Sequence, residues 1–150
     1  MNLESAMRVA LERARFGAVA SGDVPVGAVV LNPKGELIAM GNNQRELLRD
    51  PIGHAEMIAI RSAARALGSW RLEGCTLVVT LEPCAMCAGA IMQARIPRVV
   101  FGAWDEKAGA AGSVWDLLRD PRALHKVEVV SDVLKEECAA LLKEFFSEQR

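Results

Sequence analysis

Hydrophobic and polar residues alternate along the chain with two periods, one typical of helices and one typical of buried strands. Over residues 3–20, apolar side chains recur every three or four positions, which predicts an amphipathic helix. Short runs of β-branched and apolar residues, bounded by Gly, Pro, Asn or Asp, predict strands. These strands are expected at 26–31, 36–40, 76–81, 98–102 and 127–130.

Further helices are expected between and after the strands, and proline and glycine mark their ends. They are predicted at 54–67, from beside Pro83 to before Pro97, and at 132–146. Gly68 is the expected terminator of the first of these, and Asp132 is expected near the N-cap of the last. Residues 41–53 contain two Gly, two Asn and the pair Asp50-Pro51 and are predicted to form a loop. The order α-β-β-α-β-α-β-β-α predicts one α/β domain over residues 1–150, with an antiparallel hairpin first and crossover helices after it.

Composition and charge exclude several classes of protein. Of the 150 residues, 51% are hydrophobic, and 18 basic residues face 19 acidic ones, which excludes a disordered charged tail. The longest apolar run, Val24–Leu31, is far shorter than the ~18–20 residues that span a membrane. With no signal peptide visible, we expect a cytoplasmic protein with no membrane partner. The net charge of −1 averages unlike segments, because 95–126 holds six bases and four acids. It therefore does not exclude an RNA partner.

The four cysteines fall into two pairs of different character. Four is too few for a disulfide scaffold, and intracellular thiols are more often structural, catalytic or metal-bound. Cys138 recurs with leucines at helical spacing and Cys75 opens an apolar strand, so both are expected in the core. Cys84 and Cys87 instead lie where a strand leads into a predicted helix.

A second pair of polar residues, His54 and Glu56, lies at the start of another predicted helix. Cys84 and Cys87, three residues apart, share one face of a first turn, where the helix end favours thiolates. One imidazole and two thiolates would give Zn²⁺ three ligands and leave the fourth position to water, as in catalytic zinc sites. Such a water has a pKa near 7, and Glu56 is placed to take and return protons. This set suits hydrolytic attack on an amidine-like carbon with loss of ammonia.

Each half of the pattern has another interpretation when it is taken alone. His54 and Glu56 fit a capping or solvated pair, and a Cys-x-x-Cys motif after a strand fits a thioredoxin-like redox site. A thiol oxidoreductase would leave His54 and Glu56 without a task, and a non-catalytic RNA-binding module would leave Glu56 without one. Together with Pro83, these residues resemble the H-x-E…P-C-x-x-C signature of zinc nucleobase deaminases.

Over nearly its whole length the chain resembles the bacterial tRNA-specific adenosine deaminases. The motifs that carry the likeness are Val24–Val29, Gly41–Asn43, His54–Glu56, Thr80–Ala90, Arg98–Ala103, Asp105, Lys107–Ser113, Glu137-Cys138 and Phe145-Phe146. The resemblance implies a three-layer α/β/α cytidine-deaminase-like fold around a central mixed five-stranded sheet. It also implies a homodimer that converts adenosine to inosine at the wobble position of an arginine tRNA anticodon. It places one Zn²⁺ per subunit on His54, Cys84 and Cys87, and proton transfer on Glu56.

The same resemblance assigns substrate contacts, each of which also has a structural interpretation. The implied contacts are Asn43, Val26, Leu81, Asp105, Lys107 and Phe145. Asn43 suits a purine edge or a ribose, but asparagine also tolerates turn conformations. Asp105 and Lys107 also fit solvated loop charges, and the three apolar residues also fit core packing.

Two features keep the substrate open. Many relatives have Arg directly after the residue that matches Asn43, whereas this chain has Gln44. The near-neutral charge favours the alternative, a deaminase of a free base or nucleoside such as guanine or cytosine on the same fold. The segment Gly109–Ser113 and the pair Phe145-Phe146 favour the tRNA enzyme.

Overall fold

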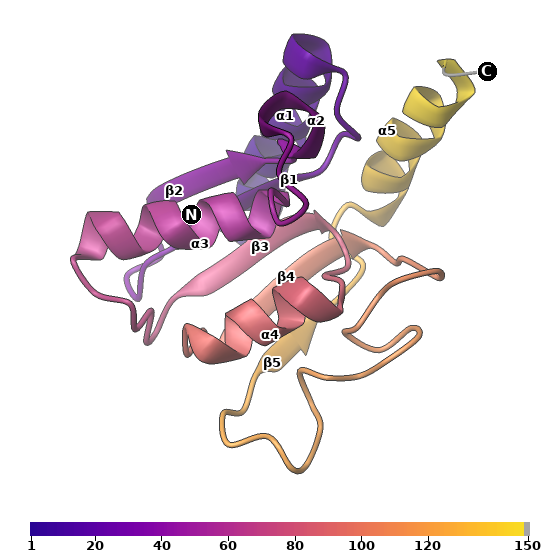
Figure 1. The fold of residues 1–150 in the computed structure, drawn as a ribbon. Coiled ribbons are helices and arrows are strands. Elements are labelled where there is room, and N and C mark those ends of the chain that lie inside the picture. The colour runs from indigo at the N-terminus through magenta and orange to yellow at the C-terminus, as the bar shows by residue number, and fades with distance from the viewer. Residues whose placement is uncertain (149–150) are drawn as a thin grey trace.

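A five-stranded mixed sheet lies between two helical layers in the computed structural model, which describes residues 1–148 (Figure 1). The strands are β1 (Gly27–Leu31), β2 (Leu37–Asn42), β3 (Thr76–Leu81), β4 (Arg98–Ala103) and β5 (Glu128–Val130). The helices are α1 (Leu3–Ser21), α2 (Arg45–Leu48), α3 (Ala55–Leu67), α4 (Ala85–Gln93) and α5 (Lys135–Glu148).

The sheet has the order β2-β1-β3-β4-β5, and β1 is antiparallel to both of its neighbours. Strands β3, β4 and β5 run parallel to one another, with α4 as the crossover between β3 and β4. This arrangement confirms the predicted three-layer α/β/α class, with its early hairpin and later crossovers. Because β1 is antiparallel to β2 and β3, its amino end lies beside the carboxyl ends of both neighbouring strands, at one end of the strands.

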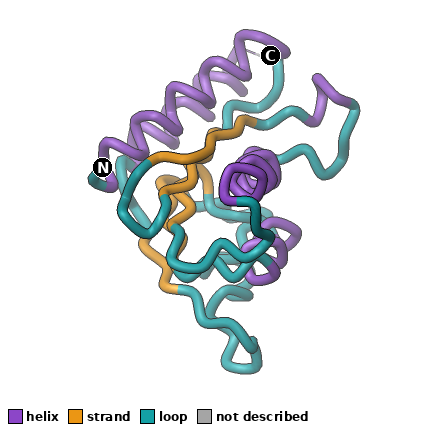
Figure 2. The backbone as a smooth tube through the Cα atoms, turned by 90° about the vertical axis from the view of Figure 1, so that its left-hand side faces the viewer, coloured by secondary structure: helices purple, strands orange, loops and turns teal. Residues whose placement is uncertain are grey.

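The two helical layers bury separate cores on the two faces of the sheet (Figure 2). Helices α1 and α5 cover one face, where Met7 and Leu11 pack with Val29, Val78 and other strand residues. Helices α3 and α4 cover the other face, and the buried face of α3 consists largely of alanines, whose small side chains let this helix approach the sheet closely. Cys138 is buried in the first core and Cys75 in the second, as their sequence patterns predict.

Two helix ends show how far local signals determine the boundaries. Gly68 adopts a φ of 65° and ends α3, as predicted. Helix α4 ends at Gln93, earlier than Pro97 alone suggests, because Arg95 takes the left-handed position of a Schellman motif with a φ of 62°. The N–H groups of Arg95 and Ile96 donate to carbonyls of the last helical turn, an arrangement that sequence patterns associate with glycine.

The prediction of a loop throughout residues 41–53 is wrong. Strand β2 continues through Asn42, and the single helical turn α2 follows it. The first N–H groups of α2 bond to side-chain oxygens outside the helix, including both carboxylate oxygens of Asp23. Because the two contacts with Asp23 join distant segments, no local sequence pattern predicts them.

The predicted start of the closing helix at Asp132 is also wrong. Asp132 and Leu134 have φ angles of 68° and 53°, so regular helical bonding begins only at Lys135. The Asp132 carboxylate accepts a hydrogen bond from the Trp104 indole N–H at 3.0 Å rather than capping the helix. Within residues 1–148, none of the helices combines the length and apolar character that a membrane crossing needs.

Candidate active site

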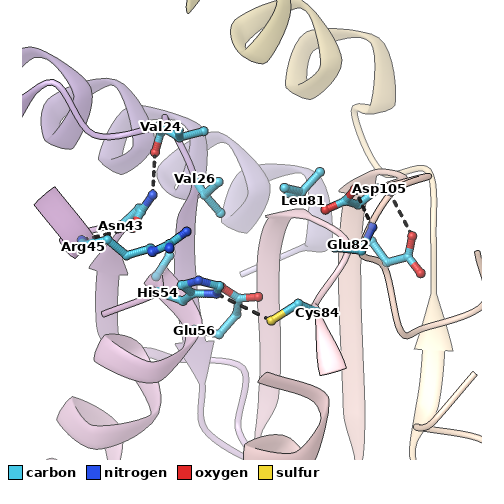
Figure 3. Close-up of a pocket in the computed structure, with 12 residues that line it drawn as sticks. Val24, Val26, Asn43, Arg45, His54, Glu56, Leu81, Glu82, Cys84 and Asp105 are labelled. Carbon is cyan, nitrogen blue, oxygen red and sulfur yellow. Dashed lines mark hydrogen bonds between the residues drawn. The ribbon is translucent and has the colours of Figure 1, made fainter. Parts of the chain in front are cut away.

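Helices α3 and α4 begin at the same end of the sheet, beside the carboxyl ends of β2 and β3, and their first residues meet there. His54 is the N-cap of α3, Cys84 is the N-cap of α4, and Cys87 lies in the first turn of α4. Neither N-cap residue forms a side-chain capping hydrogen bond, and the imidazole and the thiol face one another (Figure 3). Nδ1 of His54 lies 3.6 Å from the Sγ of Cys84 and 3.5 Å from the Sγ of Cys87. The two halves of the sequence pattern therefore converge.

These three side chains fit a zinc ion. Their ligand atoms all lie within 4.8 Å of one another. Ligand atoms around a tetrahedral Zn²⁺, with bonds of 2.0–2.3 Å, are separated by about 3.3–3.8 Å. The remaining thiols and imidazole are occupied elsewhere, because Cys75 and Cys138 are core residues and Nε2 of His125 lies 2.8 Å from the carbonyl of Ile96. Among the described residues, His54, Cys84 and Cys87 form the one group of three such side chains whose atoms lie close enough together to hold a metal ion.

The protein groups alone already favour a negative charge at Cys84. The hydrogen bond with Cys87 lowers the pKa of Cys84 to about 3, and the same contact raises the pKa of Cys87 above its usual range. The hydrogen bond with Cys84 also raises the pKa of His54. Zinc binds cysteine in the thiolate form, so the lowered pKa suits Cys84 to the role of a zinc ligand.

Glu56 lies in the first turn of α3 and is only 4% exposed. Burial raises the pKa of its carboxyl group to about 7. A carboxyl group with a pKa near neutrality both accepts and donates protons readily. Because α3 begins between His54 and Glu56, the two side chains line one pocket although they are only two residues apart.

A pocket of about 230 Å³ lies over this cluster. It is lined by Val24, Val26, Asn43, Arg45, His54, Ala55, Glu56, Leu81, Glu82, Cys84, Asp105 and Ala108. Four of the six expected substrate contacts are therefore pocket residues, namely Val26, Asn43, Leu81 and Asp105. The other two line neighbouring hollows that share residues with the pocket. Lys107 lines one hollow together with Leu81 and Asp105, and Phe145 lines another together with Asn43.

The amide of Asn43 combines a structural role with free bonding capacity. Its Nδ2 donates to the carbonyl of Val24 at 3.3 Å, and its Oδ1 accepts from the N–H of Arg45 at 3.2 Å (Figure 3). An asparagine amide has two N–H groups and two acceptor lone pairs. One donor and one acceptor therefore remain for a ligand, so the turn interpretation and the substrate interpretation are compatible.

Arg45 is a pocket residue that the sequence reasoning missed. It follows Gln44, the position where many relatives carry Arg, and Gln44 itself does not line the pocket. Figure 3 shows the Arg45 side chain extending over His54. Because the segment reads as a loop, the sequence holds no signal for the helical turn that carries Arg45.

Glu82 is a second residue that the sequence reasoning missed. Its carboxylate is 2% exposed and accepts hydrogen bonds from the N–H groups of Asp105 (3.0 Å), Ala111 (2.9 Å) and Ser113 (3.1 Å). A Cβ at Gly109 would collide with this carboxylate, so glycine is required there. Glu82 therefore fixes the loop that forms one wall of the pocket. The available signal is a lone acid at the end of an apolar strand, directly before Pro83.

Replacing Glu82 with glutamine is expected to loosen this wall. The amide has one oxygen in place of two, so at least one buried N–H loses its acceptor, which costs about 1–3 kcal/mol of unfolding free energy. Denaturant unfolding measures the loss, and hydrogen exchange at residues 105–113 locates it. The exposed Glu128→Gln on β5 is the matched control. An unchanged unfolding free energy together with unchanged exchange in Glu82→Gln would refute this role.

Comparisons with known proteins agree with this geometry. Residues 1–103 match the cytidine and deoxycytidylate deaminase zinc-binding region. The chain is 52% identical, over 96% of its length and 88% of the relative's, to the tRNA-specific adenosine deaminase of Bacillus subtilis strain 168. A solved structure from work on A-to-I editing by tRNA:A34 deaminases superposes with a TM-score of 0.87 at 42% identity, over 92% of this chain and 99% of the other. Guanine deaminase from Nitrosomonas europaea superposes with a TM-score of 0.80 at 27% identity, over 96% and 84%.

Proposed function

Because the chain belongs to the zinc-binding family of cytidine and deoxycytidylate deaminases, we propose that it converts adenosine to inosine at the wobble position of a tRNA anticodon. The observation that carries the proposal is the convergence of His54, Cys84 and Cys87 with the buried Glu56 in one pocket. The likeness to tRNA-specific adenosine deaminases over nearly the whole chain supports the choice of substrate.

The reaction adds one water to C6 of adenosine and releases one ammonia, and this chain's residues supply the proton transfers. We assign zinc binding to His54, Cys84 and Cys87, where a bound zinc ion would lower the pKa of a water molecule to near 7. Glu56 would accept one proton from the attacking water and pass it to N1 of the purine, and would then carry the second proton, from the hydroxyl group now on C6, to the departing amine. A pKa of about 7, raised by burial, suits a group that must do both.

The pocket walls suit a nucleotide whose base is turned out of an RNA loop. Val26 and Leu81 offer apolar surface to the base, and Asn43 keeps one donor and one acceptor for its polar atoms. We assign Asp105, Lys107 and Phe145, which lie in and beside the pocket, to the flanking nucleotides. A base in an anticodon loop is already partly unstacked, so turning it out costs less there than in a duplex.

Family membership extends the proposal beyond the site. We propose one zinc per subunit, a homodimer, an arginine tRNA as substrate, and action in the cytoplasm. The chain is proposed to act as a single deaminase domain over residues 1–150, of which the last two lie outside the described residues. Metal analysis, light scattering and deamination assays on individual tRNAs test these points separately.

Wild-type protein is expected to form inosine and ammonia from an anticodon stem-loop with adenosine at the wobble position, and to leave free guanine and cytosine unchanged. The same stem-loop with guanosine at that position is the matched control and should release no ammonia. The second candidate, a free-base deaminase, is favoured by the likeness to guanine deaminase. Ammonia from free bases without inosine in the RNA would establish that candidate and overturn the tRNA proposal.

A further inference from the structure

The single helical turn α2 carries part of the pocket wall but cannot be stable alone. It has only four residues, whereas isolated helices shorter than ~12–15 residues are marginal in water. Arg45 begins this turn, and Asn43 precedes it by two positions. Since both side chains line the pocket, its shape depends on whatever holds α2 in place.

Asp23, from the segment between α1 and β1, provides this anchor. Its side chain is buried (1% exposed), and Oδ1 accepts the N–H of Glu46 at 2.7 Å while Oδ2 accepts the N–H of Leu47 at 3.2 Å. The hydroxyl of Ser21 donates to the same carboxylate. N–H groups in the first turn of a helix have no partners within the helix, and a negative charge is favourable at that end. Asp23 satisfies two of them across 23 and 24 residues of sequence.

The remaining early N–H of α2, that of Arg45, bonds to Oδ1 of Asn43. Asn43 and Asp23 together therefore bind three successive N–H groups of the turn. Among residues 1–148, no acid forms an ion pair with the Arg45 guanidinium, which reaches over His54 at the pocket (Figure 3). Moving α2 would displace both this cation and the Asn43 amide.

We propose that Asp23 is a positioning residue for substrate binding, which caps α2 from a distant segment and thereby fixes Asn43 and Arg45 at the pocket. This inference rests on the proposed function, because its kinetic test uses the anticodon stem-loop. Asp23 does not line the catalytic pocket, and it borders the adjoining hollow together with Asn43 and Arg45, with its own side chain buried. Its loss therefore weakens the binding of a polyanionic substrate while the zinc ligands and Glu56 keep their places.

The kinetic test uses full-length zinc-loaded protein and the stem-loop RNA. Asp23→Ala is expected to raise KM about tenfold, with kcat changed less than about twofold and zinc content unchanged. Asp23→Asn keeps one acceptor oxygen and is expected to restore part of the loss. Asn32→Ala is the matched control, because Asn32 also accepts two N–H groups, those of Lys34 and Glu36, but in the β1–β2 turn at the far end of the sheet. It should lower stability without changing KM.

A double-mutant cycle shows whether Asp23 acts through α2. In an Arg45→Ala background, Asp23→Ala is expected to raise KM by clearly less than it does alone. An unchanged KM in Asp23→Ala, an equal rise in Asn32→Ala, or full additivity with Arg45→Ala would overturn the inference.

Hydrogen exchange gives a readout that needs no catalysis. Exchange at residues 44–48 should accelerate in Asp23→Asn. This variant preserves the shape of the side chain, so it can be measured even if Asp23→Ala fails to fold. Exchange at 105–113 should stay unchanged. Unaltered exchange at residues 44–48 would overturn the inference, whether or not the wild type acts on the stem-loop. A wild type that is inactive on the stem-loop would overturn only the proposed function.

Discussion

Glu56→Ala is expected to abolish inosine formation while the fold and the bound zinc remain. Glu56 is not among the three residues whose atoms converge as ligands, but its buried carboxyl group lines the same pocket. A single general acid–base group contributes about 10²–10⁴-fold to a rate, and Glu56 is assigned all the proton transfers, so we expect kcat to fall by ~10³-fold or more. Nucleoside analysis of the stem-loop measures the rate, and metal analysis measures the zinc.

Glu56→Gln separates the loss of the proton carrier from the loss of volume. It should be as inactive as Glu56→Ala, because an amide of similar shape cannot carry the proton. In zinc-free protein, folding raises the pKa of Glu56 from 4.5 to about 7, so the wild type loses stability relative to Glu56→Gln as the pH rises through this range. Denaturant unfolding at several pH values measures this difference. Turnover like that of the wild type in either variant would remove Glu56 from the mechanism.

Cys87→Ala is expected to release the zinc and, with it, the activity. Only His54 and Cys84 would remain as ligands, so zinc affinity should fall by more than the ~10–100-fold that follows the loss of a residue supporting a ligand. Metal analysis after dialysis measures the zinc, and the stem-loop assay measures activity. Cys75→Ala, at a buried thiol in the core, is the matched control and should retain both.

Thiol titration of the wild type distinguishes this site from a redox pair. With stoichiometric zinc bound, Cys84 and Cys87 should resist modification until a chelator is added. Full zinc occupancy in Cys87→Ala would contradict the assigned ligand set. A wild type without zinc that cycles between free thiols and a Cys84–Cys87 disulfide would establish the thiol oxidoreductase interpretation instead.

The sequence predicts the zinc-site candidates and all five strands because both depend on local patterns. Strand β3 is recognisable as a continuous β-branched and apolar run, since both of its faces are buried. His54, Glu56, Cys84 and Cys87 stand out because the chemistry requires particular residue types at the starts of two helices. The chain-long resemblance then supplies the substrate, which spacing alone leaves open.

The features that escape prediction depend on contacts between distant segments. Glu82 bonds to N–H groups 23 to 31 residues away, and Asp23 caps a turn 23 and 24 residues further along. Arg95 and Asp132 adopt left-handed conformations that local propensity assigns to glycine, and they set the end of α4 and the delayed start of α5. Both buried carboxylates organise the pocket walls, so the sequence predicts the chemistry better than the pocket that houses it.

The most direct test of hydrolytic deamination is to run the reaction on the wobble-adenosine stem-loop in water enriched in oxygen-18. Attack by water at C6 places one solvent oxygen on the purine. Mass spectrometry should therefore find inosine that carries one heavy oxygen after reaction with the wild type, and no inosine after incubation with Glu56→Ala. If the wild type forms no inosine, or forms inosine without the heavy oxygen, the result would contradict hydrolysis at a zinc site formed by His54, Cys84 and Cys87 with Glu56 as the proton carrier.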